Sequence, residues 1–304
     1  MEMQQLVIAG AGPAGVSAAL YAVRMGFPPL VIHNGYGALE KAEKIENYYG
    51  LPAPISGKEL YKNGLSQLQA LNVPVLKDEL LSITYDGEYT IQTSENVYHT
   101  KALILATGTK RNTLSLKELK KYEGNGISYC AVCDAFFYRG KKVAFLGNSD
   151  FALHEAQELK NVTPSVTIYT NGEKPEFTKD HAIEVNTMKI QSIEGEQTVS
   201  GLLMESDVRA AENEKTEASF YPAAGVFVAM GTAGSTEIAR QMGAELTAKG
   251  NIRVNEKMET TIPGLFAAGD CTGGLLQVSK AVYEGSMAGI SAGTYVRRRH
   301  ADQA

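Results

Sequence analysis

The sequence predicts an α/β protein with two Rossmann-like nucleotide-binding domains, the second inserted into the first. Three observations support this prediction. A glycine-rich turn follows an apolar run near the N-terminus, a second strand-turn-helix pattern starts near residue 143, and an apolar strand over 264–270 ends in an acid before a helical stretch over 277–299. Breaks near residues 110 and 240 give a first domain over 1–110 and 240–304 and an inserted domain over 111–239.

The first expected strand, over 6–9, leads into a turn with the pattern GxGxxG, and helix-forming residues follow through Arg24. The motif alone is a weak signal, but a strand before it and a helix after it are the context that a dinucleotide site requires. Gly10 and Gly12 allow the backbone to approach a pyrophosphate, Gly15 allows the helix to pack on the sheet, and the helix amides face the phosphates. A glycine-rich turn in a ligand-free domain is the less favoured alternative. The turn consists of Gly10, Ala11, Gly12, Pro13, Ala14 and Gly15.

The later strands of the first domain define its other loops. A strand over 30–33 ends in His33 and Asn34 rather than in the acid that binds the ribose of NAD, which argues against NAD at this site. An apolar run over 102–106 leads into Thr107 and Gly108. The strand that ends at Asp270 offers a carboxylate that can hold a ribityl hydroxyl.

The inserted domain carries a CxxC motif near its start, formed by Cys130 and Cys133 and followed by Asp134. Two thiols at this spacing can close a small disulfide, and an outside dithiol can exchange with it through a mixed disulfide. Asp134 adds a proton donor or acceptor where the leaving thiolate forms. The motif therefore predicts disulfide chemistry. A strand over 143–146 and Gly147 then open the second strand-turn-helix unit.

Composition and charge exclude several classes of protein. The net charge of −5 argues against non-specific nucleic-acid binding. No stretch approaches the run of about 18 apolar residues that a membrane span needs, and the N-terminus lacks a signal sequence, so we expect a cytoplasmic protein. Three cysteines are too few for a secreted disulfide framework. Cys271 has no nearby CxxC or HxxxH partner, so we expect it to be buried and expect no metal site.

Six motifs resemble those of the low-molecular-weight thioredoxin reductases, in the same order and spacing, along essentially the entire chain. They are GAGPAG at 10–15, IENYYG at 45–50, ATG at 106–108, CAVCD at 130–134, GVFVAMG at 225–231 and IPGLFAAGD at 262–270. The resemblance implies domains of the three-layer FAD/NAD(P) type, an FAD that spans the first domain, a homodimer, and thioredoxin as the protein substrate.

The resemblance also implies roles for individual residues. Cys133 would face the flavin ring, Cys130 would exchange with the substrate disulfide, and Asp134 would be the acid beside them. Phe136 and Phe137 match an aromatic pair that receives thioredoxin, although two core phenylalanines explain the sequence equally well. The implied FAD contacts are the turn over 10–15 together with Asn47, Ala106, Thr107, Gly108, Gly269, Asp270, Gln277 and Val278.

The second nucleotide site departs from the NADPH-using relatives. Their turn GxGxxA is replaced by residues 147–152, with Ser149 where bare backbone should approach a pyrophosphate. Their motif HRRxxxR, which grips the 2′-phosphate, is replaced by residues 170–176. All three arginines are absent, and Glu176 reverses the charge. Leu276 replaces a further arginine just before Gln277.

These departures resemble the ferredoxin-dependent flavin thioredoxin reductases, which lack both NADPH motifs. We therefore expect reduced ferredoxin to be the electron donor, since a ferredoxin at about −400 mV can reduce a disulfide at about −270 mV. Two alternatives remain. One is an NADPH- or NADH-dependent enzyme in which Glu173 meets a ribose hydroxyl, and the other is a flavin-binding redox sensor without turnover. The basic residues that could dock an acidic ferredoxin are Lys117, Lys120, Lys121, Lys141, Lys142, Arg297, Arg298 and Arg299.

Overall fold

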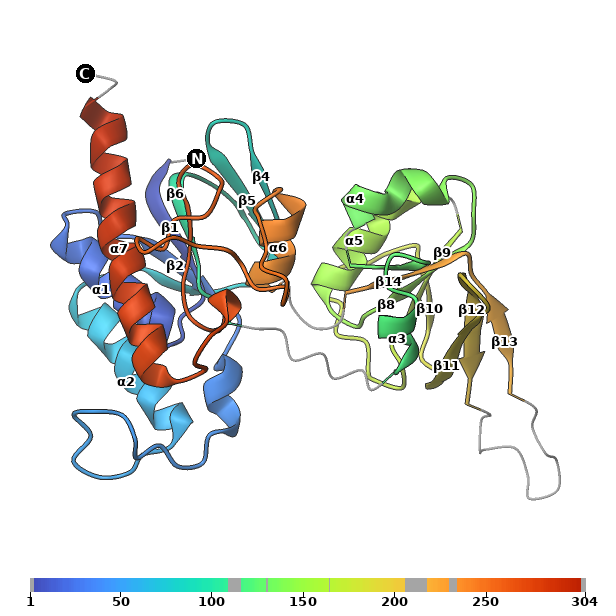
Figure 1. Ribbon diagram of the computed structural model, residues 1–304, viewed down its shortest axis with the longest axis horizontal. Coiled ribbons are helices and arrows are strands. Elements are labelled where there is room, and N and C mark those ends of the chain that lie inside the picture. The colour runs from blue at the N-terminus through green and yellow to red at the C-terminus, as the bar shows by residue number, and fades with distance from the viewer. Residues whose placement is uncertain are drawn as a thin grey trace. The chain divides into compact units, whose positions relative to one another are not determined.

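The computed structural model describes residues 3–108, 116–129, 131–163, 165–205, 218–229 and 234–301, with the backbone alone for Val132 and Cys133. The chain forms two compact units, Met1–Thr109 with Ala233–Ala304, and Lys110–Thr232. Each unit contains a parallel sheet with helices, which confirms the predicted α/β class (Figure 1). The boundary expected at residue 110 lies outside the described residues. The one expected near 240 falls within α6 (Ser235–Gln241), which belongs whole to the first unit.

The first unit is built on a seven-stranded sheet in the order β3-β2-β1-β6-β5-β4, with β15 beside β6. Ala9 pairs with Leu105, and Leu105 pairs with Ala267, so the carboxyl ends of β1, β6 and β15 lie at the same edge of the sheet. The parallel strands are β1 (Gln4–Ala9), β2 (Leu30–His33), β3 (Val75–Lys77), β6 (Val97–Leu105) and β15 (Leu265–Ala267). The antiparallel strands are β4 (Leu80–Tyr85) and β5 (Tyr89–Thr93).

Glycines allow the helices α1 (Pro13–Arg24) and α7 (Val278–Ala301) to pack closely side by side (Figure 1). A Cβ at Gly285 would lie 2.1 Å from the carbonyl oxygen of Ala14, and one at Gly289 would lie 2.2 Å from that of Ala18. No helix in the described part of the chain is both long and apolar enough to cross a membrane. The unit also contains α2 (Gly57–Ala70) and the short 3-10 segments η1 (Gly37–Lys41) and η3 (Asp270–Thr272).

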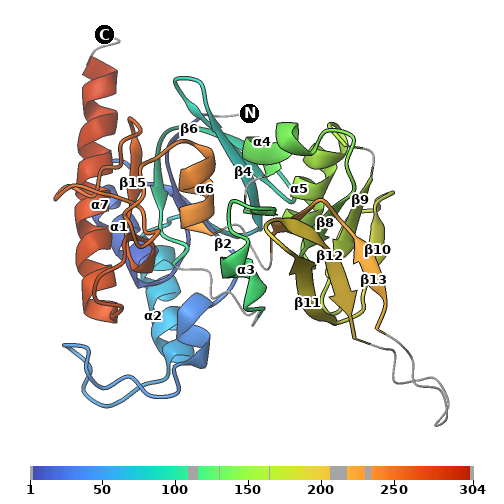
Figure 2. The same ribbon diagram turned by 45° about the vertical axis from the view of Figure 1, so that its right-hand side comes forward.

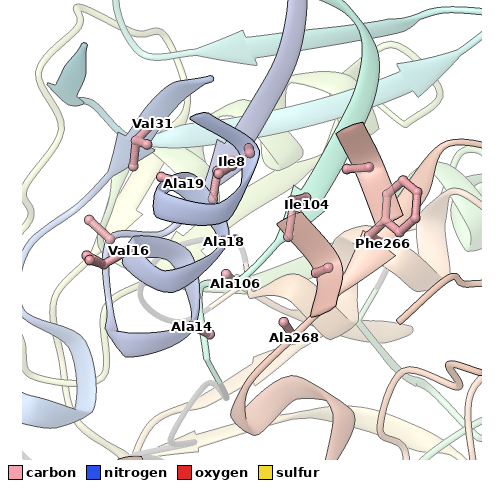
Figure 3. Close-up of a cluster of buried hydrophobic side chains, with 14 of the residues drawn as sticks. Ile8, Ala14, Val16, Ala18, Ala19, Val31, Ile104, Ala106, Phe266 and Ala268 are labelled. Carbon is pink, nitrogen blue, oxygen red and sulfur yellow. The ribbon is translucent and has the colours of Figure 1, made fainter. Parts of the chain in front are cut away.

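The core of the first unit lies between this helix pair and the sheet. Leu6 and Ile8 of β1, Ile104 of β6 and Phe266 of β15 are almost fully buried, as expected for parallel strands that are covered on both faces. Figure 3 shows that Ala14, Ala106 and Ala268 lie at one end of this cluster, where their elements meet the loops. The core thus fixes the positions of the loops that the sequence assigned to a nucleotide.

The second unit contains a parallel sheet and a separate antiparallel sheet (Figure 2). Ala144 and Leu146 of β8 point into the core that both sheets share, whereas Phe145 points to the opposite face and stacks on Phe227. The parallel order is β10 (Glu184–Asn186), β9 (Val166–Tyr169), β8 (Val143–Leu146), β14 (Gly225–Val228) and β7 (Ile127–Ser128). The antiparallel strands are β11 (Ile190–Gly195), β12 (Val199–Met204) and β13 (Phe220–Pro222), and the helices are α3 (Glu118–Lys121), α4 (Ala131–Asp134), η2 (Ala135–Tyr138) and α5 (Asp150–Lys160).

Candidate flavin and dithiol sites

The glycine-rich turn after β1 combines two tightly packed positions with one open position. A Cβ at Gly10, where φ is +110°, would lie 2.3 Å from the Ala106 carbonyl oxygen, and a Cβ at Gly15 would lie 1.9 Å from the Gly10 carbonyl oxygen. Gly12 has nothing within 4 Å of its Cβ position. Because Gly12 is the N-cap of α1 and no side chain caps that helix, the turn leaves space and free helix amides for a phosphate group.

The loop after β6 is tied to the start of α6 by two residues that are far apart in the sequence. The Thr107 N–H donates to Ser235 Oγ at 3.0 Å, and the Ser235 N–H donates to Thr107 Oγ1 at 2.8 Å. The two hydroxyls lie 2.7 Å apart. The structure thus places Ala106 beside Gly10 as expected, but the Thr107 side chain caps α6. The sequence analysis missed Ser235, although a serine after Gly234 is a helix-start signal.

The loop after β15 meets the glycine-rich turn. Gly269 takes a φ of +88°, and a Cβ there would lie 3.0 Å from the Ala14 Cβ. Asp270 is partly exposed, and its carboxylate has no hydrogen-bond partner among the residues that the structure describes. Cys271 is fully buried, and burial raises the pKa of its thiol to about 12. The expectation of a buried Cys271 is therefore confirmed.

Two further residues expected to contact a flavin are hydrogen-bonded to each other. Asn47 Nδ2 donates to Gln277 Oε1 at 3.0 Å, so the loop that contains IENYYG lies against the residue before α7. Val278 is the first residue of that helix. Tyr49, Leu275 and Leu276, in the same two segments, are exposed.

These features fit a flavin nucleotide in the first unit. The turns after β1, β6 and β15 follow aligned carboxyl ends of parallel strands, which is where ligands bind in open α/β sheets. The open side of Gly12 suits a phosphate, and the Asp270 carboxylate, which is unpaired among the described residues, suits a hydroxyl-bearing chain. The fold brings Gly10 beside Ala106 and Thr107, and Gly269 beside Ala14. Asn47 and Gln277 are joined to each other separately.

The dithiol motif lies in the second unit. Cys130 lies outside the described residues, and Cys133 is described by its backbone alone, within α4. Asp134 ends α4 and is partly exposed. The pKa of Tyr138 is raised, mainly by the burial of its own hydroxyl and further by the nearby charge of Asp134. Phe136 and Phe137 are 73% and 68% exposed, which excludes the alternative that they are core residues.

A buried carboxylate that the sequence analysis missed lies against the same motif. Glu155 on α5 is only 3% exposed, and its Oε2 accepts a hydrogen bond from the Ala131 N–H at 3.3 Å. Ala131 directly follows Cys130, so this carboxylate lies beside the backbone of the CxxC motif. The signal was present in the helical spacing, because Glu155 falls on the buried face of α5 between Phe151 and Leu159.

The turn that corresponds to a second nucleotide site is bonded to the loop after β9. The Glu176 N–H donates to the Asn148 carbonyl oxygen at 2.7 Å, and Asn148 Nδ2 donates to Glu173 Oε2 at 3.0 Å. Asp150, buried at the start of α5, accepts from the N–H and the hydroxyl of Thr178 at 2.8 and 2.5 Å. A carboxylate therefore lies at the turn where a pyrophosphate would have to approach.

The conformation of this loop is also unsuited to the expected arginines. Asn171 and Gly172 both have positive φ, at 54° and 82°, a region that asparagine and glycine tolerate and arginine disfavours. Asn171 Oδ1 accepts from the Ile190 N–H at 2.8 Å and so anchors the loop to β11. The change from the NADPH-binding pattern thus involves the backbone as well as the side chains.

The basic residues considered for ferredoxin docking are divided between the units. The five lysines belong to the second unit, whereas the arginines lie at the end of α7 in the first. Arg297 donates to the Met25 carbonyl oxygen at 2.9 Å, and Arg299 donates to that of Gly87 at 3.0 Å, so both hold α7 in place.

Comparison with known proteins agrees with a flavin-dependent disulfide reductase. Residues 4–285 match the family of pyridine nucleotide-disulphide oxidoreductases. The chain is 32% identical to the thioredoxin reductase of Aquifex aeolicus, over 88% of this chain and 85% of that protein. It is 33% identical to a 34.2 kDa protein in the rubredoxin operon of Clostridium pasteurianum, over 96% of each.

Two solved structures are similar over almost their whole length. The atypical thioredoxin reductase TRi from Desulfovibrio vulgaris Hildenborough has a TM-score of 0.88 and 37% identity, over 97% of this chain and 99% of that one. A ferredoxin-flavin thioredoxin reductase from Clostridium acetobutylicum has a TM-score of 0.70 and 30% identity, over 99% and 100%. The chain therefore belongs to the pyridine nucleotide-disulphide oxidoreductases and, among them, to the low-molecular-weight, flavin-dependent thioredoxin reductases.

Proposed function

We propose that this protein is an FAD-dependent thioredoxin-disulfide reductase that takes electrons from reduced ferredoxin and passes them through the Cys130/Cys133 dithiol to thioredoxin. The choice of donor rests on one observation. Glu173 is hydrogen-bonded to Asn148 in the turn that would have to bind the pyrophosphate of NADPH. A similar ferredoxin-flavin enzyme among the solved structures supports the same choice.

The loss of positively charged side chains lowers the affinity expected for NADPH. Hydrogen bonds to charged groups contribute about 1.5 to 3 kcal/mol each, so the loss of two or three arginine contacts removes about 4 to 9 kcal/mol if they are additive. Each 1.4 kcal/mol is about a tenfold change, so micromolar NADPH binding becomes millimolar or weaker. The Glu173 carboxylate, which is hydrogen-bonded to Asn148, adds electrostatic repulsion of the NADPH phosphates to this loss of affinity. The same contact occupies the Glu173 carboxylate that the NAD(P)H alternative assigns to a ribose hydroxyl.

In the proposed FAD site, the glycine-rich turn accommodates the pyrophosphate through its open side. This turn consists of Gly10, Ala11, Gly12, Pro13, Ala14 and Gly15. Asp270 holds the ribityl chain, and Asn47, Gln277 and Val278 contact the ring. Ala106, Thr107, Gly108 and Gly269 shape the pocket through their backbones. When bound, the flavin supplies one-electron acceptance from an iron-sulfur donor together with two-electron transfer to a disulfide.

The dithiol then carries the electrons to the substrate. Cys133 exchanges electrons with the flavin, Cys130 attacks the thioredoxin disulfide, and Asp134 supplies the proton to the leaving thiolate. Two reduced ferredoxins and two protons balance the conversion of one thioredoxin disulfide to two thiols. The exposure of Phe136 and Phe137 supports their role as the surface that receives thioredoxin.

The test is anaerobic stopped-flow measurement of the flavin absorbance. We expect a reduced low-potential ferredoxin to bleach the flavin band rapidly, whereas NADPH or NADH at micromolar concentration leaves it unchanged. Rapid bleaching by either nucleotide would instead assign the protein to the NAD(P)H-dependent enzymes. If chemically reduced protein passed no electrons to any thioredoxin, the redox-sensor alternative would hold.

Two matched variants separate the steps of this reaction. Cys130→Ser should leave flavin bleaching by ferredoxin intact but abolish thioredoxin reduction. Phe136→Ser with Phe137→Ser should raise KM for thioredoxin without changing the bleaching rate, because both side chains are exposed. The homodimer that the resemblance implies is part of the proposal, and light scattering of the purified protein tests it.

A further inference from the structure

A largely buried ion pair on α7 holds the loop that carries Asp270. Lys280 Nζ lies 3.0 Å from Glu284 Oε2, and the two side chains are 14% and 12% exposed. The Lys280 ammonium donates to the Gly269 carbonyl oxygen and to the Thr272 hydroxyl, both at 2.7 Å. Glu284 Oε2 accepts from the Gly269 N–H and from the Thr272 hydroxyl, both at 2.8 Å. One ion pair thus binds both polar backbone groups of Gly269.

These contacts lie on both sides of Asp270. Gly269 precedes it and Thr272 closes the short turn η3, whose backbone also bonds from the Thr272 N–H to the Gly269 carbonyl oxygen at 3.1 Å. With the backbone fixed before and after Asp270, the direction of its Cα–Cβ bond is fixed too. The carboxylate itself has no partner among the described residues, so the clamp orients a group that is left available for a ligand.

We propose that Lys280 and Glu284 are positioning residues for the flavin, which hold the Asp270 carboxylate in its binding direction before the flavin arrives. A preorganised carboxylate loses less conformational entropy on binding, so the clamp strengthens flavin affinity. The inference rests on the proposed function, in which Asp270 holds the ribityl chain.

Packing elsewhere allows this role to be separated from a structural one. Gly285 and Gly289 of α7 lie against the α1 backbone at Ala14 and Ala18, whereas the hydrogen bonds of the Lys280–Glu284 pair go to Gly269 and Thr272. Replacement of both members of a buried ion pair by apolar residues of similar volume is often neutral for stability, whereas removal of one member leaves an uncompensated charge. The double replacement is therefore the informative variant.

The experiment uses the full-length protein freed of flavin and titrated with FAD, with binding followed by the fluorescence of the flavin. We expect Lys280→Met with Glu284→Gln, which keeps an oxygen for the Gly269 N–H, to raise the Kd for FAD several-fold while the melting temperature of the flavin-free protein stays unchanged. Lys280→Met with Glu284→Met should raise the Kd further, at least tenfold, and should also lower the melting temperature, because the buried Gly269 N–H loses its acceptor.

A cycle with Asp270 decides between positioning and other causes. In an Asp270→Ala background, the double replacement should weaken FAD binding no further, because the group that it positions is gone. An equally large loss in that background overturns the inference, as does an unchanged FAD affinity in the double variant. A lower melting temperature of the flavin-free Lys280→Met/Glu284→Gln variant, with the affinity loss, also overturns it, since the pair is then structural.

The control is the exposed ion pair Glu245–Arg253 in the same unit, joined at 3.0 Å. Its replacement by two methionines should change neither the Kd nor the melting temperature. The wild-type titration tests the underlying proposal separately. If the wild-type protein binds no FAD, the proposed function fails; if it binds FAD and the double variant binds equally well, only the clamp fails.

Discussion

Asn47 Nδ2 donates to Gln277 Oε1 at 3.0 Å, joining two segments that are separated by 230 positions in the chain. The family resemblance implies that Asn47 lies near the flavin and that Gln277 contacts its ring, and the fold makes the two residues neighbours. The pair connects the loop over 42–56 to the start of α7. It therefore defines the side of the first unit on which we place the ring.

Loss of the Asn47–Gln277 pair should weaken flavin binding more than it weakens the fold. The bond is exposed, so Asn47→Ala or Gln277→Ala should lower the free energy of unfolding by no more than about 1 kcal/mol. The Kd for FAD should rise several-fold in each variant, as measured by titration of flavin-free protein. Asn255→Ala, which removes three exposed side-chain hydrogen bonds to Lys257 and Glu259 in the same unit, is the control and should bind FAD normally. If both variants bound FAD normally, the flavin ring would not lie at this location.

Two glycines of the same turn should respond in opposite ways to alanine. A Cβ at Gly12 meets nothing within 4 Å, and its φ of −73° suits any residue, so Gly12→Ala should fold normally but bind FAD at least tenfold more weakly. Gly10→Ala should prevent stable folding, because its Cβ would lie 2.3 Å from the Ala106 carbonyl oxygen at a φ of +110°. Circular dichroism melting with FAD titration checks both. If Gly12→Ala bound FAD like the wild type, the pyrophosphate would lie elsewhere.

The sequence predicted those parts of the molecule that depend on local patterns. A parallel strand followed by a glycine-rich turn has a distinctive composition, so β1, β8 and the turns that follow them were predicted in place. The acid after β15 was predicted for the same reason. The departure of residues 170–176 from an arginine-rich motif was visible in the letters, and the positive φ of Asn171 and Gly172 gives it a conformational basis.

The parts that could not be predicted depend on pairings between distant residues. Nothing local indicates that the distant Thr107 accepts from the Ser235 N–H and so caps α6, or that Glu155 accepts from the Ala131 N–H. A Lys and a Glu at i,i+4 usually form an exposed pair on a helix, and burial of Lys280 follows only from the packing of α7 against the loop after β15. Phe136 could be assigned to the core or to the surface until its exposure was known.

The free energy of unfolding should decrease as the pH falls below about 6.5, because His33 titrates there. Its Nδ1 accepts from the Gly35 N–H at 3.2 Å and therefore also from the Tyr61 hydroxyl at 2.8 Å, which requires the neutral ring. Burial lowers the pKa of His33, and the charge of Lys77 has a smaller lowering effect. The folded protein thus binds this proton less tightly than the unfolded chain, whose histidines titrate near about 6.5. The stabilisation is complete above that pH and is lost as the pH falls through the lower folded-state pKa.

Urea denaturation of the flavin-free protein between pH 8 and pH 5 measures this effect. His33→Gln should flatten the pH dependence of the free energy of unfolding in the first unit. Burial lowers the pKa of His154 in the second unit as well, so His154→Gln should remove a separate component of the same sign. His99→Gln is the control. His99 lies on β6, and its Nδ1 is hydrogen-bonded to the hydroxyl of Thr90 on the neighbouring strand β5. An unaltered slope in His33→Gln would show that another group causes the acid loss.

Removal of the Glu155 charge should make the reduced CxxC motif more reactive. Its carboxylate is buried and lies 3.3 Å from the Ala131 amide nitrogen, and a nearby negative charge disfavours the thiolate. Glu155→Gln keeps an oxygen for this amide and removes the charge, so iodoacetamide should alkylate the reduced variant faster at neutral pH than the wild type. Glu155→Leu leaves the buried amide unpaired and should cost about 1 to 3 kcal/mol of stability. Glu158→Gln, exposed on the same helix, should change neither quantity. If Glu155→Gln and Glu158→Gln gave the same alkylation rates from pH 6 to pH 9, Glu155 would support the helix without influencing the thiols.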